Sequence, residues 1–125
     1  MAQQLHHDII LVVEDEPFVR MIAVDLLAEQ GRIILEAGNA EEALEILDAE
    51  DRIDLLFTDI NMPGELDGLD LAKIAYRRQP DLKLIVTSGA KRLTSDEIPD
   101  DGAFIPKPYS TQTLTRLVQS KLSAS

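Results

Sequence analysis

The chain has 125 residues and no cysteine, which fits one domain spanning residues 1–125 and excludes disulfides, thiolate metal sites and cysteine catalysis. Its formal net charge of −11 at pH 7 argues against a nucleic-acid surface and against an anionic membrane face. Hydrophobic residues make up 45% of the chain and aromatic residues only 4%, so we expect a globular domain with an aliphatic core. The apolar run at residues 9–13 is too short for a signal peptide or a membrane span, which predicts a cytoplasmic protein.

The first part of the chain predicts a buried strand followed by a helix. Residues 9–13 are all apolar, as is typical of a strand that is covered on both faces. Pro17 suits the first turn of a helix, because that position needs no backbone N–H. Apolar residues such as Phe18 and Ile22 then recur at helical spacing to about Gln30, which predicts where this helix ends.

The middle of the chain repeats this alternation. Residues 33–35 predict a second strand, and residues 55–57 predict a third strand that runs into Asp59. Between them Asn39 is expected to cap a helix, with Glu42 completing a capping box three residues later.

The last part of the chain contains the least regular segment. Residues 91–101 predict a helix of only one or two turns, because Pro99 interrupts it. The other predicted elements are a helix over about residues 69–78, a strand at 82–86, a strand at 103–105 and a final helix that begins at Ser110 or Thr111 and reaches 122.

Five strands that alternate with five helices predict an α/β fold with one parallel sheet. Right-handed crossovers then place helices on both faces of that sheet. Sheets of this kind bind ligands at the carboxyl ends of their strands. These ends carry the following polar residues: Glu14, Asp15 and Glu16 after the first strand, Asp59 and Asn61 after the third, Thr87 and Ser88 after the fourth, and Lys107 after the fifth.

The combination of these side chains favours phosphoryl transfer to a carboxylate. Clustered carboxylates repel one another and need a cation, and an oxygen-rich ligand set favours a hard ion such as Mg²⁺. Lys107 can supply a second positive charge, and a hydroxyl can donate to an added oxyanion. A nucleophile, a metal, a cation and a hydrogen-bond donor are the parts that this reaction requires.

Each feature taken alone has a plainer interpretation. The acids at residues 14–16 could cap the first helix, and Asp59 could form an Asx-turn before Pro63. Thr87 and Ser88 are ordinary turn residues, and a lysine at position 107 is more often solvated than catalytic. The features favour a site because all of them fall in register with strand ends.

Five motifs in order resemble the receiver family of response regulators, from residue 9 to residue 122. They are LVVEDEP at residues 11–17, FTDINMPG at 57–64, DGLDL at 67–71, VTSG at 86–89 and IPKPY at 105–109. The resemblance implies a flavodoxin-like doubly wound (βα)5 fold. Its five parallel strands would lie in the order 2-1-3-4-5, within a core of about residues 8–122.

The resemblance also implies roles for individual residues. Asp59 is similar to the phospho-acceptor of the family, and Asp15 to the direct Mg²⁺ ligand. Glu14 is similar to the outer acid that holds a metal-bound water, and the backbone carbonyl of Asn61 completes the metal shell. Lys107 resembles the lysine that pairs with the acceptor carboxylate, in a family where the following peptide bond is often cis.

The resemblance further implies a conformational switch. The switch hydroxyl falls on Ser88, with Thr87 as the second candidate. Phe104 is similar to the aromatic residue that turns inward when the hydroxyl moves toward the phosphoryl group. This movement would alter the face made by the fourth helix, the fifth strand and the last helix. The short, proline-containing helix at residues 91–101 puts dimerisation through this face in doubt, and Pro106 has no functional explanation from the sequence.

Three functions are compatible with these features. The favoured one is a single-domain response regulator that takes a phosphoryl group from a sensor histidine kinase or a histidine phosphotransferase and acts on a downstream protein, with a monomer favoured. It would turn over no small substrate and would bind neither nucleic acid nor membrane. The alternatives are a receiver-like scaffold that is independent of phosphorylation and a phosphatase of the haloacid dehalogenase type. The last is disfavoured because that family needs an aspartate where this chain has Asn61.

Overall fold

All five predicted strands pair in parallel into one sheet in the order β2-β1-β3-β4-β5, as expected. The structure is a computed structural model that describes residues 7–29, 31–90 and 92–123. The elements are β1 (Ile9–Val13), α1 (Pro17–Ala28), β2 (Ile33–Ala37), α2 (Ala40–Ala49), β3 (Leu55–Asp59), α3 (Gly68–Arg78), β4 (Lys83–Ser88), the 3₁₀ turns η1 (Ser95–Glu97) and η2 (Pro99–Asp101), β5 (Ala103–Pro106) and α4 (Thr111–Ser123).

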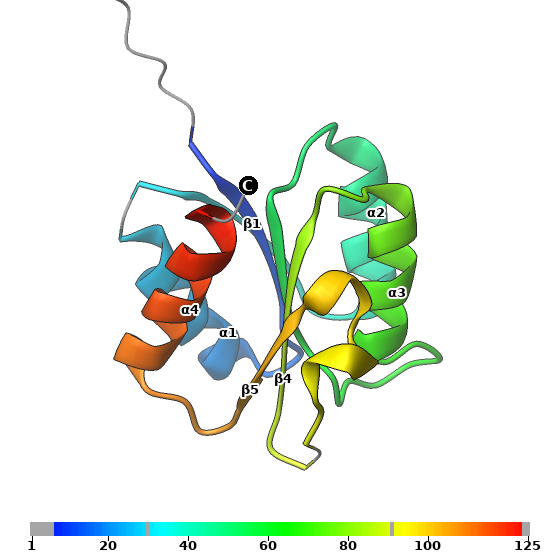
Figure 1. Ribbon diagram of the computed structural model, residues 1–125. Coiled ribbons are helices and arrows are strands. Elements are labelled where there is room, and N and C mark those ends of the chain that lie inside the picture. The colour runs from blue at the N-terminus through cyan, green and yellow to red at the C-terminus, as the bar shows by residue number, and fades with distance from the viewer. Residues whose placement is uncertain (1–6, 30, 91, 124–125) are drawn as a thin grey trace, which may run out of the picture.

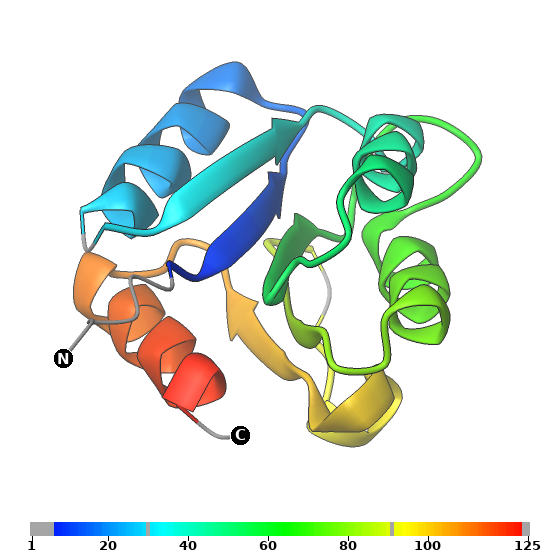
Figure 2. The same cartoon turned by 90° about the horizontal axis from the view of Figure 1, so that it is seen from above.

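The sheet is buried on both faces because its central strands are continuously apolar. Helices α1 and α4 lie on one side of the sheet and α2 and α3 on the other (Figures 1 and 2). Alternate residues of β1 supply the two cores: Ile10 and Val12 pack toward α1 and α4, whereas Leu11 and Val13 pack toward α2 and α3. No helix in the described part of the chain is long and apolar enough to cross a membrane.

Helix α1 begins at Pro17, as predicted, and ends at Ala28; the expected end at Gln30 lies outside the described residues. Its apolar stripe is only partly buried. Ala23 and Leu27 face the core, but three large apolar side chains of the first two turns are exposed. Their exposed fractions are Phe18 75%, Met21 48% and Ile22 60%.

The predicted capping box of α2 forms only in part. The Asn39 side chain accepts a hydrogen bond from the Glu42 N–H at 2.8 Å, as expected of an N-cap. The Glu42 carboxylate, however, accepts from the N–H of Gly38 at 2.7 Å instead of returning to Asn39. A reciprocal capping box occurs at α3, between Asp67 and Asp70.

The predicted helix at residues 91–101 is wrong: its described part forms the two 3₁₀ turns η1 and η2. Pro99 cannot continue a helix, and Ile98 before it is extended, with φ −113° and ψ 134°. Asp100 then takes a positive φ of 55°. Ile98 is almost fully buried against the α2–α3 side of the sheet, so it anchors the segment without a helix.

Pro106 has a structural explanation at the edge of the sheet. The Lys107 N–H points inward and donates to the Ser88 carbonyl at 3.0 Å. Because N–H groups of successive strand residues point to opposite sides, position 106 faces the free edge of β5. Proline there removes an edge donor, which is a common protection against unwanted strand pairing.

Candidate functional site

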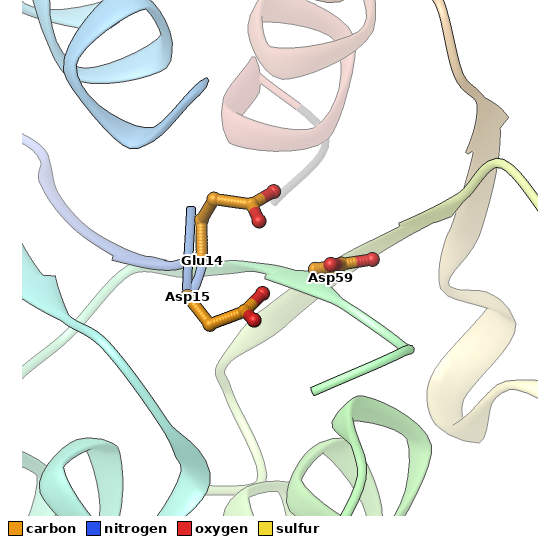
Figure 3. A group of neighbouring side chains, drawn as sticks. All are labelled: Glu14, Asp15 and Asp59. Carbon is orange, nitrogen blue, oxygen red and sulfur yellow. The ribbon is translucent and has the colours of Figure 1, made fainter. Parts of the chain in front are cut away.

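The carboxyl ends of β1 and β3 bring three acidic side chains together. Glu14 and Asp15 follow β1, and Asp59 is the last residue of β3. Their side chains converge on one space (Figure 3), and one carboxylate oxygen of each lies within 4.8 Å of the others. Three convergent oxygen donors could hold a small divalent cation, since hard ions prefer carboxylate ligands.

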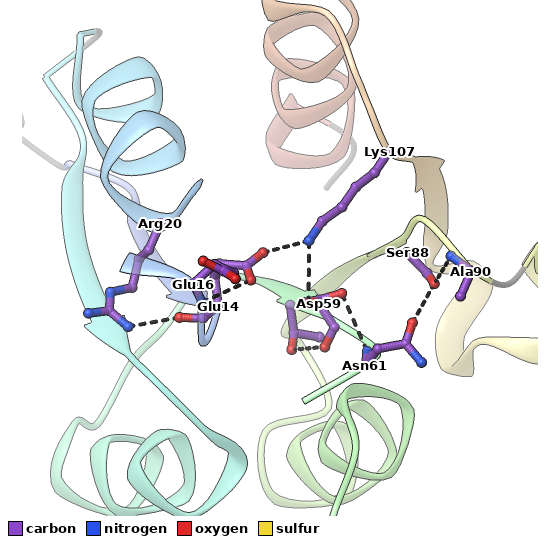
Figure 4. A network of polar contacts seen from close by, with 9 residues as sticks. Glu14, Glu16, Arg20, Asp59, Asn61, Ser88, Ala90 and Lys107 are labelled. Atoms are coloured by element: carbon purple, nitrogen blue, oxygen red, sulfur yellow. Dashed lines mark hydrogen bonds and ion pairs between the residues drawn. The ribbon is translucent and has the colours of Figure 1, made fainter. Parts of the chain in front are cut away.

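Lys107 reaches this group from the loop after β5. Its Nζ lies 2.8 Å from Glu14 Oε1 and 3.4 Å from Asp59 Oδ2 (Figure 4). The Lys107–Pro108 peptide bond is cis, as the resemblance implied. The simpler interpretation of Lys107 as a solvated side chain is therefore wrong, because its ammonium group bridges two buried carboxylates.

The charges of the group are unbalanced. Three carboxylates and one ammonium carry a net charge of −2 when all are ionised. Burial raises the pKa of Glu14; the hydrogen bond from Lys107 opposes this, and the charge of Asp59 adds to it. Burial opposes the charge on Lys107, but the hydrogen bond to Glu14 and the charge of Asp59 raise its pKa above the usual value.

The loop that carries Glu14 is held from several sides. The backbone N–H of Glu14 donates to the Ala37 carbonyl at 3.1 Å, and the backbone carbonyl of Glu14 accepts from Arg20 Nη1 at 2.8 Å. Arg20 also contacts Glu36, with Nε and Oε1 3.3 Å apart. Glu14 Oε2 also accepts from the Glu16 N–H at 3.2 Å, whereas the side chain of Glu16, the N-cap of α1, makes no capping bond within the described residues.

The backbone of Asp59 is fixed by the loop that returns to α3. The Gly68 N–H donates to the Ile60 carbonyl at 2.9 Å, and Thr58 Oγ1 donates to the Asp59 carbonyl at 2.9 Å. A Cβ on Gly68 would lie 1.9 Å from the Asp59 carbonyl oxygen, so only glycine fits this approach. The Asn61 N–H contacts Asp59 Oδ1 at 3.4 Å, a long contact of the Asx-turn type.

The two candidate switch hydroxyls have different surroundings. Ser88 Oγ donates to Asn61 Oδ1 at 2.6 Å and accepts from the Ala90 N–H at 3.0 Å. Thr87 Oγ1 is buried and has no hydrogen-bond partner in the described part of the chain. Ser88 is therefore the hydroxyl that is connected to the acidic group, through Asn61.

Phe104 lies apart from the acidic group, on the edge strand. It is half-buried and packs against the α2–α3 side of the core. Together with Pro106, Arg116 and Leu117 it lines a groove between β5 and α4. The structure thus leaves the predicted switch aromatic in contact with both the core and the surface.

An apolar groove beside the site was not predicted from the sequence. It is lined by Val19 and Ile22 of α1 and by Lys107, Pro108 and Tyr109 after β5. Tyr109 packs edge-to-face on Phe57, with ring centroids 5.8 Å apart. Lys107 lines this groove and also contacts Glu14 and Asp59, so the groove borders the acidic group.

Replacing Glu14 with glutamine should raise the midpoint of thermal unfolding at pH 7 in the absence of metal. The raised pKa of Glu14 means that the folded protein binds a proton more readily than the unfolded chain, whose reference value is 4.5. The resulting loss of stability is fully present above the folded-state pKa and disappears as the pH falls to 4.5. The gain in Glu14→Gln should therefore shrink toward that pH.

The matched control is Glu16→Gln, which makes the same charge change at an exposed position on the same loop. It should alter the midpoint much less at either pH. A Glu14→Gln protein that is less stable than the wild type at pH 7 would contradict the unfavourable burial of this carboxylate.

A family model of the response regulator receiver domain matches residues 10–119. Among curated relatives, the sensor kinase CckA of Brucella abortus is 37% identical over 117 residues, which are 90% of this chain and 12% of CckA. The response regulator receiver protein CpdR of the same organism is 34% identical and is matched over 93% of this chain and 98% of its own length.

A solved structure has a similar fold over nearly the whole chain. The response regulator protein TrrA of Thermotoga maritima, determined in complex with Mg²⁺ and BeF, superposes with a TM-score of 0.79 at 31% identity and covers 92% of this chain and 99% of that one. The family model spans most of the chain, and the match between this chain and CpdR covers nearly the full length of both proteins. The chain therefore belongs to the response regulator receiver family of two-component systems.

Proposed function

We propose that this protein is a phosphorylation-controlled switch in which Asp59 accepts a phosphoryl group in the presence of Mg²⁺. The observation that carries the proposal is the position of Lys107 Nζ between Asp59 and Glu14, beside three convergent carboxylates. A phosphoryl acceptor needs a carboxylate nucleophile, and it needs positive charge to meet the incoming oxygens. The acidic group and Lys107 supply both.

In the proposed reaction an oxygen of the Asp59 carboxylate attacks the phosphorus of a phosphohistidine or of an acyl phosphate. The new bond is a carboxylate O–P bond; the donor's N–P or O–P bond breaks, and the donor leaves with that electron pair. Lys107 stays ionised, as its raised pKa favours, and its ammonium group then pairs with the phosphoryl oxygens. Water later cleaves the aspartyl phosphate, which restores the Asp59 carboxylate and releases phosphate, so the phosphorylated state is transient.

The proposed cation fits the donors that are present. Asp15, Asp59 and the backbone carbonyl of Asn61 would hold Mg²⁺, with Glu14 as the outer acid. The ion would supply charge neutralisation for the phosphoryl oxygens, and it would compensate the net charge of −2 that the three carboxylates and Lys107 carry.

Output is proposed to pass through the surface made by η1, η2, β5 and α4. In this proposal Ser88 moves toward the phosphoryl group. The backbone of Lys107 moves with Ser88, because the Lys107 N–H donates a hydrogen bond to the Ser88 carbonyl. Phe104 lies on the same strand and borders the groove to α4, so a shift of β5 would change that groove. We propose an unidentified downstream protein as the reader of this surface.

The scaffold alternative has less support, because Asp59, Asp15 and Lys107 are all present and adjacent. The phosphatase alternative lacks its second aspartate, since position 61 is asparagine. A cytoplasmic location and a monomeric state stay predictions from the sequence.

Incubation with Mg²⁺ and acetyl phosphate should add one phosphoryl group to the intact mass of the wild-type protein. Asp59→Asn and addition of EDTA should each abolish the adduct, because the first removes the nucleophile and the second removes the cation. The matched control is Asp54→Asn, which changes an aspartate at the opposite end of β3 that bonds the Ile9 N–H. An adduct that persists in Asp59→Asn would contradict the assignment of the acceptor.

The phosphodonor is proposed to be a histidine kinase or histidine phosphotransferase that docks an apolar helix on the start of α1. Three large apolar side chains, Phe18, Met21 and Ile22, are exposed there. They adjoin the groove that shares Lys107 with the acceptor site, so a donor bound to them brings its histidine to Asp59. In a chain of net charge −11, exposed apolar side chains beside the nucleophile favour a partner that buries apolar surface.

The test uses a phosphorylated histidine kinase that transfers its phosphoryl group to the wild-type protein. Ile22→Asp should slow this transfer by about ten-fold or more, because an apolar anchor of the docking surface is lost. Phosphorylation by acetyl phosphate should be unchanged, because that small donor needs no docking surface. The control is Ile33→Asp, an exposed isoleucine at the start of β2, which should leave both rates unaltered. Equal loss with both donors would show damage to the site and contradict a docking role.

A further inference from the structure

Asn61 contacts both the acceptor carboxylate and the switch hydroxyl. Its backbone N–H points at Asp59 Oδ1, at 3.4 Å, and its side-chain Oδ1 accepts the hydroxyl hydrogen of Ser88, at 2.6 Å. Figure 4 shows Asn61 lying between Asp59 and Ser88, with Ala90 beyond the hydroxyl. The role that the resemblance implies for Asn61 involves its backbone carbonyl, whereas the contact with Ser88 involves its side chain.

The contact has a chemical consequence, because a serine hydroxyl has one hydrogen to donate. In the unphosphorylated protein that hydrogen goes to Asn61, while the Ala90 N–H already donates to the oxygen of Ser88. A phosphoryl group on Asp59 needs the same hydrogen. The amide of Asn61 and the phosphoryl group therefore compete for Ser88.

We propose that the side chain of Asn61 is a latch that holds Ser88 in the resting position until Asp59 is phosphorylated; this rests on the proposed function. The competition favours release on phosphorylation, because a hydrogen bond to a charged oxygen is stronger than one to a neutral amide. Before phosphorylation the amide satisfies a buried hydroxyl and keeps it in place.

The latch also acts on the proposed output surface. The Ser88 carbonyl accepts the Lys107 N–H, and Ser88 pairs with Pro106 in the β4–β5 register. Holding Ser88 thus holds the end of β5. Asn61 is a positioning residue in this scheme, since it acts through Ser88.

The test is a double-mutant cycle on the affinity for beryllofluoride in saturating Mg²⁺, measured by calorimetry. The four proteins are the wild type, Asn61→Ala, Ser88→Ala and the double variant. Asn61→Ala should bind beryllofluoride roughly two- to ten-fold more tightly, the range that the net contribution of one hydrogen bond covers. In the Ser88→Ala background the same substitution should produce no gain, because no hydroxyl is left to release.

Each other outcome overturns the latch. An equal gain in both backgrounds would mean that Asn61 acts on the acceptor site directly, and a loss of affinity in Asn61→Ala would mean that its amide stabilises the phosphorylated form. The Mg²⁺ affinity of each variant, measured without beryllofluoride, is the control for damage to the site. Asn61→Ala should leave this affinity unchanged, since alanine keeps the backbone carbonyl at position 61. If the wild type binds no beryllofluoride, the proposed function itself fails together with the latch.

Discussion

The repulsion among three carboxylates at one edge of the sheet is the constraint on which the site depends. Glu14, Asp15 and Asp59 come within 4.8 Å of one another, and Lys107 offsets only one of their charges. The surrounding contacts keep this unfavourable arrangement in place: Arg20 holds the carbonyl of Glu14, and a glycine at position 68 presses against the backbone of Asp59. The fold thus supplies the free energy that maintains an electrostatically strained site, as functional sites commonly require.

This constraint also explains how the proposed phosphorylation could reach a distant surface. The acidic group is connected to β4 through Asn61 and Ser88, and to β5 through Lys107, whose N–H bonds Ser88. A charge change at Asp59 therefore acts on two strands at once. The absence of an α-helix between β4 and β5 in the described residues leaves Ile98 as the buried anchor of that connection, so the surface beside it differs from the one that the sequence predicted.

The sheet and most of the site could be predicted because they depend on local signals. Apolar runs define buried strands, and parallel strands place their last residues together, which is why Asp59 and Lys107 were expected to meet. The segment before β5 was mispredicted because Pro99 and a buried isoleucine favour two 3₁₀ turns over one helix. The side-chain contacts of Arg20 and Asn61 could not be predicted, since each joins different elements of the fold. Arg20 of α1 contacts Glu36 of β2, and Asn61 contacts Ser88 of β4.

The most direct test of the account is calorimetric titration of the unphosphorylated protein with Mg²⁺ at pH 7, alongside Asp15→Asn. If the three carboxylates form one cation site, one ion should bind per chain, the affinity should fall strongly in the variant, and bound Mg²⁺ should raise the unfolding midpoint by relieving the repulsion. If no Mg²⁺ binds to a folded wild-type protein, or if Asp15→Asn binds it equally well, the acidic group is not a cation site and the proposed phosphoryl chemistry loses its basis.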